Sequence, residues 1–285
     1  MKYINKNILD VNDFINLKII KKPPDSHIHL SAVYKHKDDL KTSYINYIFF
    51  AKNYRLKDLP ISSSIKMAGK DSFIEHYVNQ KFFSDFISNF RSKNRSGFCY
   101  MCGGMNAGTL DHLLPKDNYP EFSFFSKNLI PSCDCNLKKN DNISSGLNPH
   151  FYEECDSELF YLDIFIHGLI GSQVKYDFDI KVKNGFSFKF LDLLNHHLLN
   201  HMMKFSDIEN YMKNQCARIL NNPIQALSIR SKISRRQLIE KIEDLSFIAE
   251  SEAGSPNRWD IILYKGLLKK SVVSYILGEV HKQYP

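Results

Sequence analysis

Four cysteines in two close pairs have the clearest potential for chemistry in this chain. Cys99 and Cys102 are separated by two residues and followed by two glycines, which allow a tight reversal of the backbone. Cys133 and Cys135 follow about thirty positions later and are separated by a single residue, one fewer than in the usual pair. Two such pairs joined by a loop can converge on one tetrahedral Zn2+. We therefore predict structural zinc here, in preference to buried thiols or a disulfide.

An acidic residue and a histidine stand next to each other between the two cysteine pairs. Asp111 and His112 follow an apolar Thr-Leu step and precede Pro115. Neighbouring residues in a short strand point to opposite sides, so one can hold a hard cation while the other faces a substrate. A lone Asp-His pair is usually a polar turn. The surrounding cysteines, with Asn128 and Asn136 downstream, favour a functional interpretation.

The stretch from Cys99 to Asn142 resembles the HNH endonuclease family, whose ββα-metal motif is often clamped by four zinc-binding cysteines. The resemblance covers about 45 of the 285 residues. Within the family, the stretch is most similar to HNH subunits of bacterial anti-phage systems of the Septu type. The matched residues are Cys99, Cys102, Leu110, Asp111, His112, Pro115, Lys116, Tyr119, Pro120, Glu121, Asn128, Pro131, Cys133, Cys135, Asn136 and Lys139.

The resemblance implies a role for each matched polar residue of the site. Asp111 would be a ligand of the catalytic divalent metal, and His112 would be the general base that deprotonates the attacking water. Asn128 would brace the loop that orients His112. Asn136 would be the second metal ligand, and Lys139 would face the phosphate backbone.

These residue types suit phosphodiester hydrolysis, which needs an activated water and neutralisation of the developing charge. A histidine that titrates near neutral pH suits the first task, and a cation held by carboxylate and amide oxygens suits the second. An Asp and Asn ligand set favours Mg2+ or Mn2+. With the resemblance, this predicts a metal-dependent endonuclease, with DNA favoured as its substrate and RNA left open. Lys139, Lys138 and Lys116 would contact the nucleic acid.

The Septu-type resemblance also implies a biological setting, namely the nuclease effector of an anti-phage defence system with an ATPase subunit as partner. The alternative is a zinc-knuckle protein that binds nucleic acid or a partner without catalysis. Both interpretations share the cysteines and the basic charge. Asp111, His112 and Asn136 occur together in this chain, and a protein that only binds would not need a general base beside a metal carboxylate.

The composition limits the class of partner and the cellular location that we expect, but it does not identify a function. The net charge of +7 is compatible with a polyanionic partner, but a lysine-rich solvated surface is at least as common. The first residues lack the apolar core of a signal peptide, and no run of about 18 apolar residues suggests a membrane helix. We therefore expect a cytoplasmic protein with no membrane partner.

The hydrophobic pattern predicts an α+β fold, mostly helical around a small ββα-metal zinc knuckle, with a β-hairpin after it. We expect a mainly helical region at 1–95, the HNH motif at 96–150, and the hairpin plus C-terminal helices at 151–285. Helices are predicted over 42–56 and 71–91. The hairpin would cover 174–190 with its turn at Asn184-Gly185, and four helices would follow.

Two further clusters leave alternatives open. His197 and His201 have the spacing of metal ligands on one helix face, but together with His196 they fit a polar helix surface better. The basic residues before the third of these helices could bind phosphates or a partner, or could be a solvated helix start. They are Arg230, Lys232, Arg235 and Arg236.

Overall fold

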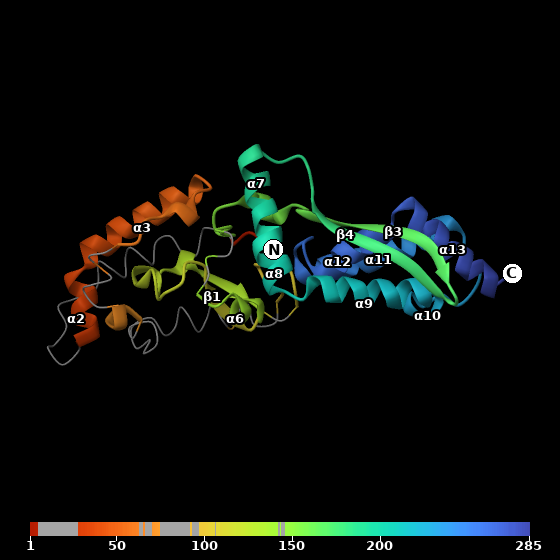
Figure 1. Cartoon of the computed structure of the whole chain (residues 1–285), viewed down its shortest axis with the longest axis horizontal. Helices are drawn as coiled ribbons and strands as arrows, with labels where there is room; N and C mark the ends of the chain where they lie inside the picture. The colour runs from red at the N-terminus through yellow and green to blue at the C-terminus, as the bar shows by residue number, and fades with distance from the viewer. Residues whose placement is uncertain are drawn as a thin grey trace. The chain divides into compact units, whose positions relative to one another are not determined.

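The structure is a computed structural model of the chain, described here for residues 1–4, 28–62, 65, 70–74, 92, 97–105, 107–141, 143 and 146–285. Its contacts define two compact units. The motif unit contains Lys2–Cys155 and Ser187–Ser206, and the hairpin unit contains Met1, Asp156–Phe186 and Asp207–Pro285. Helices and two antiparallel strand pairs make up the described chain, which confirms the predicted α+β class (Figure 1). The three-region division remains a prediction.

The motif unit combines two N-terminal helices, a short strand pair and later helices. Its elements are α2 (Ile28–Lys35), α3 (Lys37–Lys52), η2 (Leu56–Asp58), β1 (Thr109–His112), η3 (Pro120–Phe122), η4 (Ser126–Asn128), β2 (Leu129–Ser132), α6 (Cys135–Lys139), α7 (Phe188–His197), η6 (Leu198–Met202) and α8 (Met203–Phe205). The short helix η5 (Glu153–Asp156) ends where the hairpin unit begins. Of the predicted helix at 71–91, residues 75–91 lie outside the described residues, and Lys70–Ile74 are helical.

Aromatic side chains form the core between α3 and the loop that follows β1. The ring of Tyr44 stacks on Phe125 with centroids 4.1 Å apart, and Tyr47 meets Phe122 edge-on at 4.9 Å. All four side chains are buried. Tyr44 and Tyr47 are three positions apart and therefore lie on one helix face. The phenylalanines of this loop therefore pack in the core.

The ββα arrangement expected around the Asp-His pair is present in the motif unit. Strands β1 and β2 pair antiparallel, with Asp111 opposite Ile130 and His112 opposite Leu129. Helix α6 begins at Cys135, three residues after β2 ends. The two strands and the helix therefore carry the Asp-His pair and the second cysteine pair within one small motif.

The hairpin unit is built on a longer strand pair, and its predicted pairing was wrong. Strand β4 (Gln173–Val182) pairs with the preceding β3 (Phe160–Ile170), not with residues 186–190. The connection is Gly171-Ser172, and Gly171 has φ of 62°, a conformation that glycine adopts without steric strain. Phe188 instead begins α7, because Ser187 Oγ accepts a hydrogen bond from the Phe190 N–H and caps the helix.

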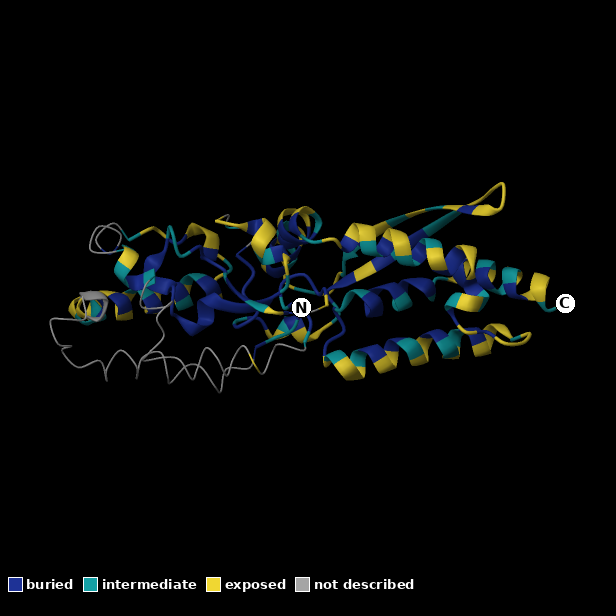
Figure 2. Ribbon diagram, turned by 90° about the horizontal axis from the view of Figure 1, so that it is seen from below, coloured by how far each residue is buried: buried dark blue, intermediate teal, exposed yellow. Residues whose placement is uncertain are grey.

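Helices pack against this strand pair in the same unit. They are α9 (Ile208–Asn221), α10 (Pro223–Ala226), α11 (Arg235–Ala253), α12 (Trp259–Leu267) and α13 (Lys270–Gln283). The predicted last helix is therefore two helices, α12 and α13. The last helix before the labelled C terminus carries buried and exposed residues on different sides (Figure 2). None of the described helices is both long and apolar enough to cross a membrane.

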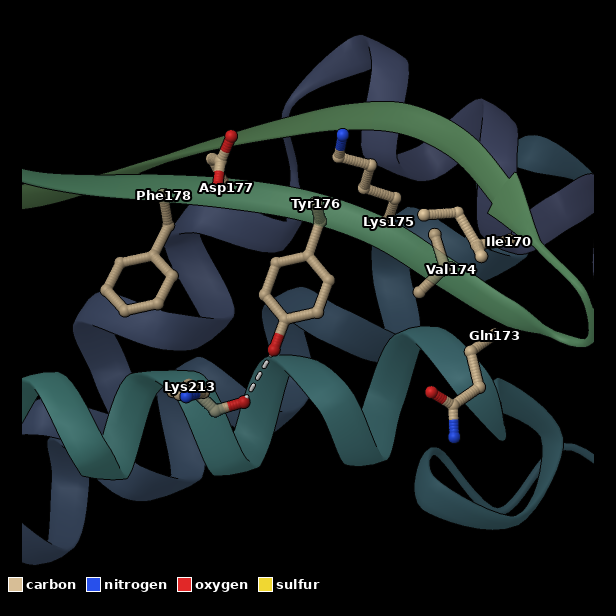
Figure 3. Close-up of a pocket in the computed structure, with 8 residues that line it drawn as sticks. All are labelled: Ile170, Gln173, Val174, Lys175, Tyr176, Asp177, Phe178 and Lys213. Atoms are coloured by element: carbon tan, nitrogen blue, oxygen red, sulfur yellow. Dashed lines mark hydrogen bonds between the residues drawn. The ribbon is translucent and has the colours of Figure 1, made fainter.

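The apolar side of β4 faces α9, as Figure 3 shows for Tyr176 and Phe178. The Tyr176 hydroxyl donates a hydrogen bond of 2.7 Å to the backbone carbonyl of Lys213 on α9. A groove of about 480 Å3 lies beside this contact. Lys175 and Asp177 on the other side of the strand are exposed, so apolar and polar side chains alternate along β4.

Candidate active site and metal centre

The four motif cysteines form one cluster in the motif unit. Their Sγ atoms all lie within 4.8 Å of one another. Cys99 Sγ is 3.6 Å from Cys135 Sγ, and Cys102 Sγ is 3.5 Å from Cys133 Sγ. A tetrahedral zinc with Zn–S bonds of about 2.3 Å separates its sulfurs by about 3.8 Å. The cluster therefore fits a metal ion such as zinc, and the short C-x-C spacing does not prevent its sulfurs from converging.

Backbone N–H groups around the cluster favour the thiolate form of its cysteines. Cys99 N–H donates to Gly104 O and Gly103 N–H donates to Cys99 O, which closes the tight turn after the first pair. The N–H of Cys102 approaches Cys99 Sγ at 3.4 Å, and the N–H of Cys135 approaches Cys133 Sγ at 3.5 Å. Donors aimed at sulfur favour its anionic form, which is the form that binds metal.

A buried histidine from α7 supports the first cysteine loop. His197 Nε2 donates a hydrogen bond of 2.7 Å to the backbone carbonyl of Met101, between Cys99 and Cys102. Its ring stacks on His201 with centroids 4.9 Å apart, across the π-helical turn η6. Burial lowers the pKa of His197 well below its usual value, so its ring is neutral.

The polar-surface interpretation of these histidines was therefore wrong, because His197 and His201 are both buried. Sequence reasoning also missed the supporting role of His197. The signal that could have found it is the four-residue spacing, which marks two rings on one side of a helix.

Asp111 is held by an unexpected partner. Its carboxylate is buried, and Oδ1 lies 2.9 Å from the Nζ of Lys139 on α6. Oδ2 has no hydrogen-bond partner among the residues that the structure describes. Burial raises the pKa of Asp111 to about 6 against the opposing effect of the Lys139 ammonium. A buried carboxylate with an unmatched oxygen can accept a further cation.

The prediction that Lys139 faces the phosphate backbone is not met. Its side chain is 1% exposed. Besides the contact with Asp111, Nζ donates a hydrogen bond of 2.8 Å to the backbone carbonyl of His112. The physical reason is the buried carboxylate, whose charge needs a nearby cation. Lys139 therefore ties α6 to the end of β1 and lies where a metal bound to Asp111 would need space.

His112 is oriented through one ring nitrogen. Its Nε2 lies 2.8 Å from the backbone carbonyl of Ser123, which can only accept, so Nε2 carries the proton. In the neutral ring the lone pair is then on Nδ1. The side chain is partly exposed, unlike that of Asp111. This arrangement can supply a base at Nδ1 whose orientation is fixed by the protein.

Asn128 is fully buried and joins the two segments that flank His112. Its Oδ1 accepts from the Leu114 N–H at 2.8 Å, and its Nδ2 donates to the Leu114 carbonyl at 3.0 Å. Nδ2 also lies 3.2 Å from the Phe122 carbonyl, next to the Ser123 that holds His112. These bonds connect Asn128 to the backbone at Leu114 and Phe122, and its bracing role remains a prediction.

The remaining predicted residues lie around the same motif. Asn136 is half-buried in the first turn of α6, three positions before Lys139, so the two occupy neighbouring positions on the helix surface. Lys138 is exposed and Lys116 is half-buried. Among the predicted lysines, Lys138 and Lys116 are therefore the ones at the surface, and Lys139 is not.

Replacing Lys139 with methionine tests whether Asp111 can hold a divalent cation. In buffer without added divalent cations or chelator, the variant should be destabilised by about 3–5 kcal/mol, because the Asp111 charge is left buried without its partner. Mg2+ or Mn2+ should raise the melting temperature of Lys139→Met more than that of the parent, because no ammonium competes. Lys138→Met, at the exposed neighbouring position, is the control. Equal metal responses in the two variants would contradict the assignment.

Comparisons with known proteins add one distant similarity. No protein-family model matches the chain, and no solved structure matches it. Protein ea31 of Escherichia phage lambda is 31% identical over 77 residues, which cover 24% of this chain and 25% of that protein. The chain thus spans about a quarter of the length of this relative. The four-cysteine cluster could bind a metal and is compatible with a zinc-clamped nuclease.

Proposed function

We propose that the motif unit is a metal-dependent endonuclease of the HNH type, which hydrolyses phosphodiester bonds of DNA. The observation that carries the proposal is the strand pair and helix that bring Asp111, His112 and the four cysteines into one motif. The fixed ring of His112 beside a buried carboxylate supports a reaction that needs both a base and a cation. The resemblance to HNH nucleases supplies the reaction type.

Each residue has a separate task in this reaction. His112 Nδ1 takes the proton of the attacking water, while its Nε2–H stays on the Ser123 carbonyl and keeps the ring in place. Asp111 and Asn136 would hold Mg2+ or Mn2+, and Asn128 keeps the surrounding loop rigid. When bound, such a cation neutralises the charge that develops on the phosphate and the leaving oxygen. Asp111 must first exchange its contact with Lys139, at least in part, for the cation.

Lys138 is the best-placed residue for testing contact with the phosphate backbone, because it is exposed beside the motif. If it contacts one phosphate, Lys138→Ala should reduce the slope of log affinity against log salt by about one. The loss should be similar for unrelated sequences, because phosphate contacts carry no base information. Titration of labelled duplexes at several salt concentrations measures both quantities.

The exposed Lys213 on α9 is the control for this experiment. Lys213→Ala should leave the slope unchanged. An unchanged slope in Lys138→Ala would instead assign the binding surface to the basic residues around α11. They are Arg230, Lys232, Arg235 and Arg236.

The substrate class is tested by direct cleavage. Purified protein is incubated with supercoiled plasmid, linear duplex and structured RNA, each with Mg2+, Mn2+ or EDTA. The proposal expects metal-dependent cleavage of DNA in preference to RNA. Preferential cleavage of RNA would keep phosphodiester hydrolysis as the reaction but would show that DNA is not the preferred substrate. Asp111→Asn is the matched inactive variant, since it removes the charge of the ligand while keeping its shape.

A role in anti-phage defence with an ATPase partner forms part of the proposal. It is supported by the similarity of the Asp111–Lys116 segment and the Tyr119–Glu121 segment to HNH subunits of Septu-type systems. A nuclease held inactive until a partner acts would also suit a site in which Lys139 already pairs with Asp111. Cleavage assays with and without an ATPase encoded beside this chain would test the partnership.

The second candidate is a zinc-knuckle binding protein without catalysis. The buried Lys139–Asp111 pair favours it, because an internal ammonium can replace a metal permanently. The two candidates differ in one measurable property. A nuclease must bind a divalent cation at Asp111 in addition to the zinc, and a binding protein need bind only the zinc.

A further inference from the structure

A separate cavity of about 270 Å3 lies in the motif unit between α3, the loop around Pro60 and η3. Polar side chains from α3 and η3 line it, namely Asp39, Thr42, Asn46 and Glu121. Leu59 and Phe122 are among its apolar walls. None of the described residues that line it is Lys, Arg or His. The cavity is therefore acidic and partly apolar, in a chain whose overall charge is positive.

Glu121 is the unusual group in this cavity. Its residue is 1% exposed, and its Oε2 has no hydrogen-bond partner among the described residues. Burial raises its pKa to about 7, although hydrogen bonds with its own backbone N–H and that of Ser62 lower it. A buried carboxylate oxygen without a donor is unfavourable, and such groups normally have a protein or ligand partner.

The ionised Glu121 carboxylate should destabilise the folded state by a measurable amount. A folded pKa near 7 against an ordinary 4.5 means that the folded chain holds the proton more tightly. The contribution of Glu121 to stability is then greatest at low pH and falls as the pH rises from about 4.5 to 7. Glu121→Gln should therefore raise the folding equilibrium constant on the order of a hundredfold at pH 8, and little near pH 4.5.

Other titratable groups lie near Glu121. They are Tyr119 on the same loop, and Asp39 with its partner His36 at the start of α3. Denaturant unfolding of parent and Glu121→Gln at the two pH values measures the difference. Equal free energies of unfolding for the parent and Glu121→Gln at pH 8 would show that the ionised Glu121 carboxylate does not destabilise the fold.

Chemistry limits what could occupy the cavity. Among the described residues that line the cavity, a phosphate or carboxylate would meet two acidic side chains and no basic one. A bare metal ion would leave the apolar walls and most of the volume unused. A positively charged nitrogen that donates hydrogen bonds would match the Glu121 oxygen, and a short hydrocarbon stem would match Leu59 and Phe122.

We propose that this cavity binds an organic cation, namely a guanidinium or primary ammonium group on an apolar stem. The group could belong to an arginine or lysine side chain of a partner protein, or to a free polyamine. Glu121 Oε2 would accept the charge-assisted hydrogen bond, and Asp39 would add charge at the rim. This proposal is independent of nuclease activity.

Calorimetric titration of the full chain at pH 8 with N-acetyl-arginine amide tests the proposal. Binding should be saturable with one site, and the neutral isostere N-acetyl-citrulline amide should not bind. Glu121→Gln should weaken binding about tenfold or more, because it removes the charge of the acceptor. Asp38→Asn, at an exposed position on α3 outside the cavity, should bind as the parent does.

Because Glu121 is buried and its replacement could disturb the fold, a second variant tests the site at an exposed position. Asn46→Arg places a cation at the exposed rim on α3 and should block the site without changing the core. Parallel titrations with N-acetyl-lysine amide and spermidine distinguish a side chain from a free polyamine. Unchanged binding in Glu121→Gln, equal binding of the citrulline derivative, or binding of Ca2+ alone would overturn the proposal.

Discussion

Replacing His112 with alanine is expected to lower the cleavage rate by about 10²- to 10⁴-fold, the usual contribution of a positioned general base. The fold should survive, because the lost side chain is partly exposed and its Nε2 contact is with the backbone carbonyl of a loop residue, Ser123. Single-turnover cleavage with saturating enzyme measures the chemical step separately from binding. Circular dichroism and zinc content should match the parent.

Two further variants separate the base from its contacts. His112→Gln can still donate to the Ser123 carbonyl but offers no basic nitrogen, so it should be as inactive as His112→Ala. His281 also contacts a backbone carbonyl, that of Ile233 at 3.0 Å, and is exposed on α13. His281→Ala should therefore keep full activity. Parental activity in His112→Gln would contradict the role of His112 as the base.

Removal of the structural zinc is expected to unfold the motif unit. Structural zinc contributes apparent binding free energies of about 10–16 kcal/mol in small domains, which matches or exceeds the whole stability of a typical fold. Cys99→Ser should lose the zinc, because a hydroxyl is a poor substitute for a thiolate. Elemental analysis should find about one zinc per parent chain and much less in the variant.

Cys216 provides the matched control for the zinc site. It is also fully buried, but it lies on α9 in the hairpin unit, and burial raises its pKa to about 12. It therefore stays a thiol and is a poor metal ligand. Cys216→Ala should keep its zinc. Metal-free parent protein that melts normally, with no zinc by elemental analysis, would rule out the zinc site.

Local patterns were enough to find the parts of the site that lie close in sequence. The cysteine pairs and the Asp-His pair were visible as spacing, and the structure brings the four sulfurs together. The α+β class and the alternating strand β4 also followed from the sequence, because the period of two is a local property.

Partners that are distant in sequence were not predictable in the same way. Strand β4 pairs with β3 and not with the apolar residues after Asn184-Gly185, because the Ser187 cap makes a helix there. The strand β3 carries apolar residues on both faces near its middle, which hides its alternation. The Asn184-Gly185 turn signal alone therefore predicted the wrong strand partner for β4.

The charge pairing inside the motif was also beyond sequence reasoning. Lys139 resembles a residue that contacts phosphate, yet it is buried against Asp111. The burial of Glu121 depends on the loop around Ser62 and on α3, which are far from it in the sequence. Such pairings are set by tertiary packing, which a single sequence does not specify.

The central claim is that this chain uses a catalytic divalent cation in addition to a tightly bound structural zinc. The decisive measurement is DNA cleavage after exhaustive dialysis against buffer that contains neither divalent cations nor a chelator, with the zinc content determined on the same sample. We expect about one retained zinc per chain, no cleavage, and recovery of cleavage on adding Mg2+ or Mn2+ to the parent but not to Asp111→Asn. Full cleavage by the zinc-only protein, or none with any divalent cation and any partner, would contradict it.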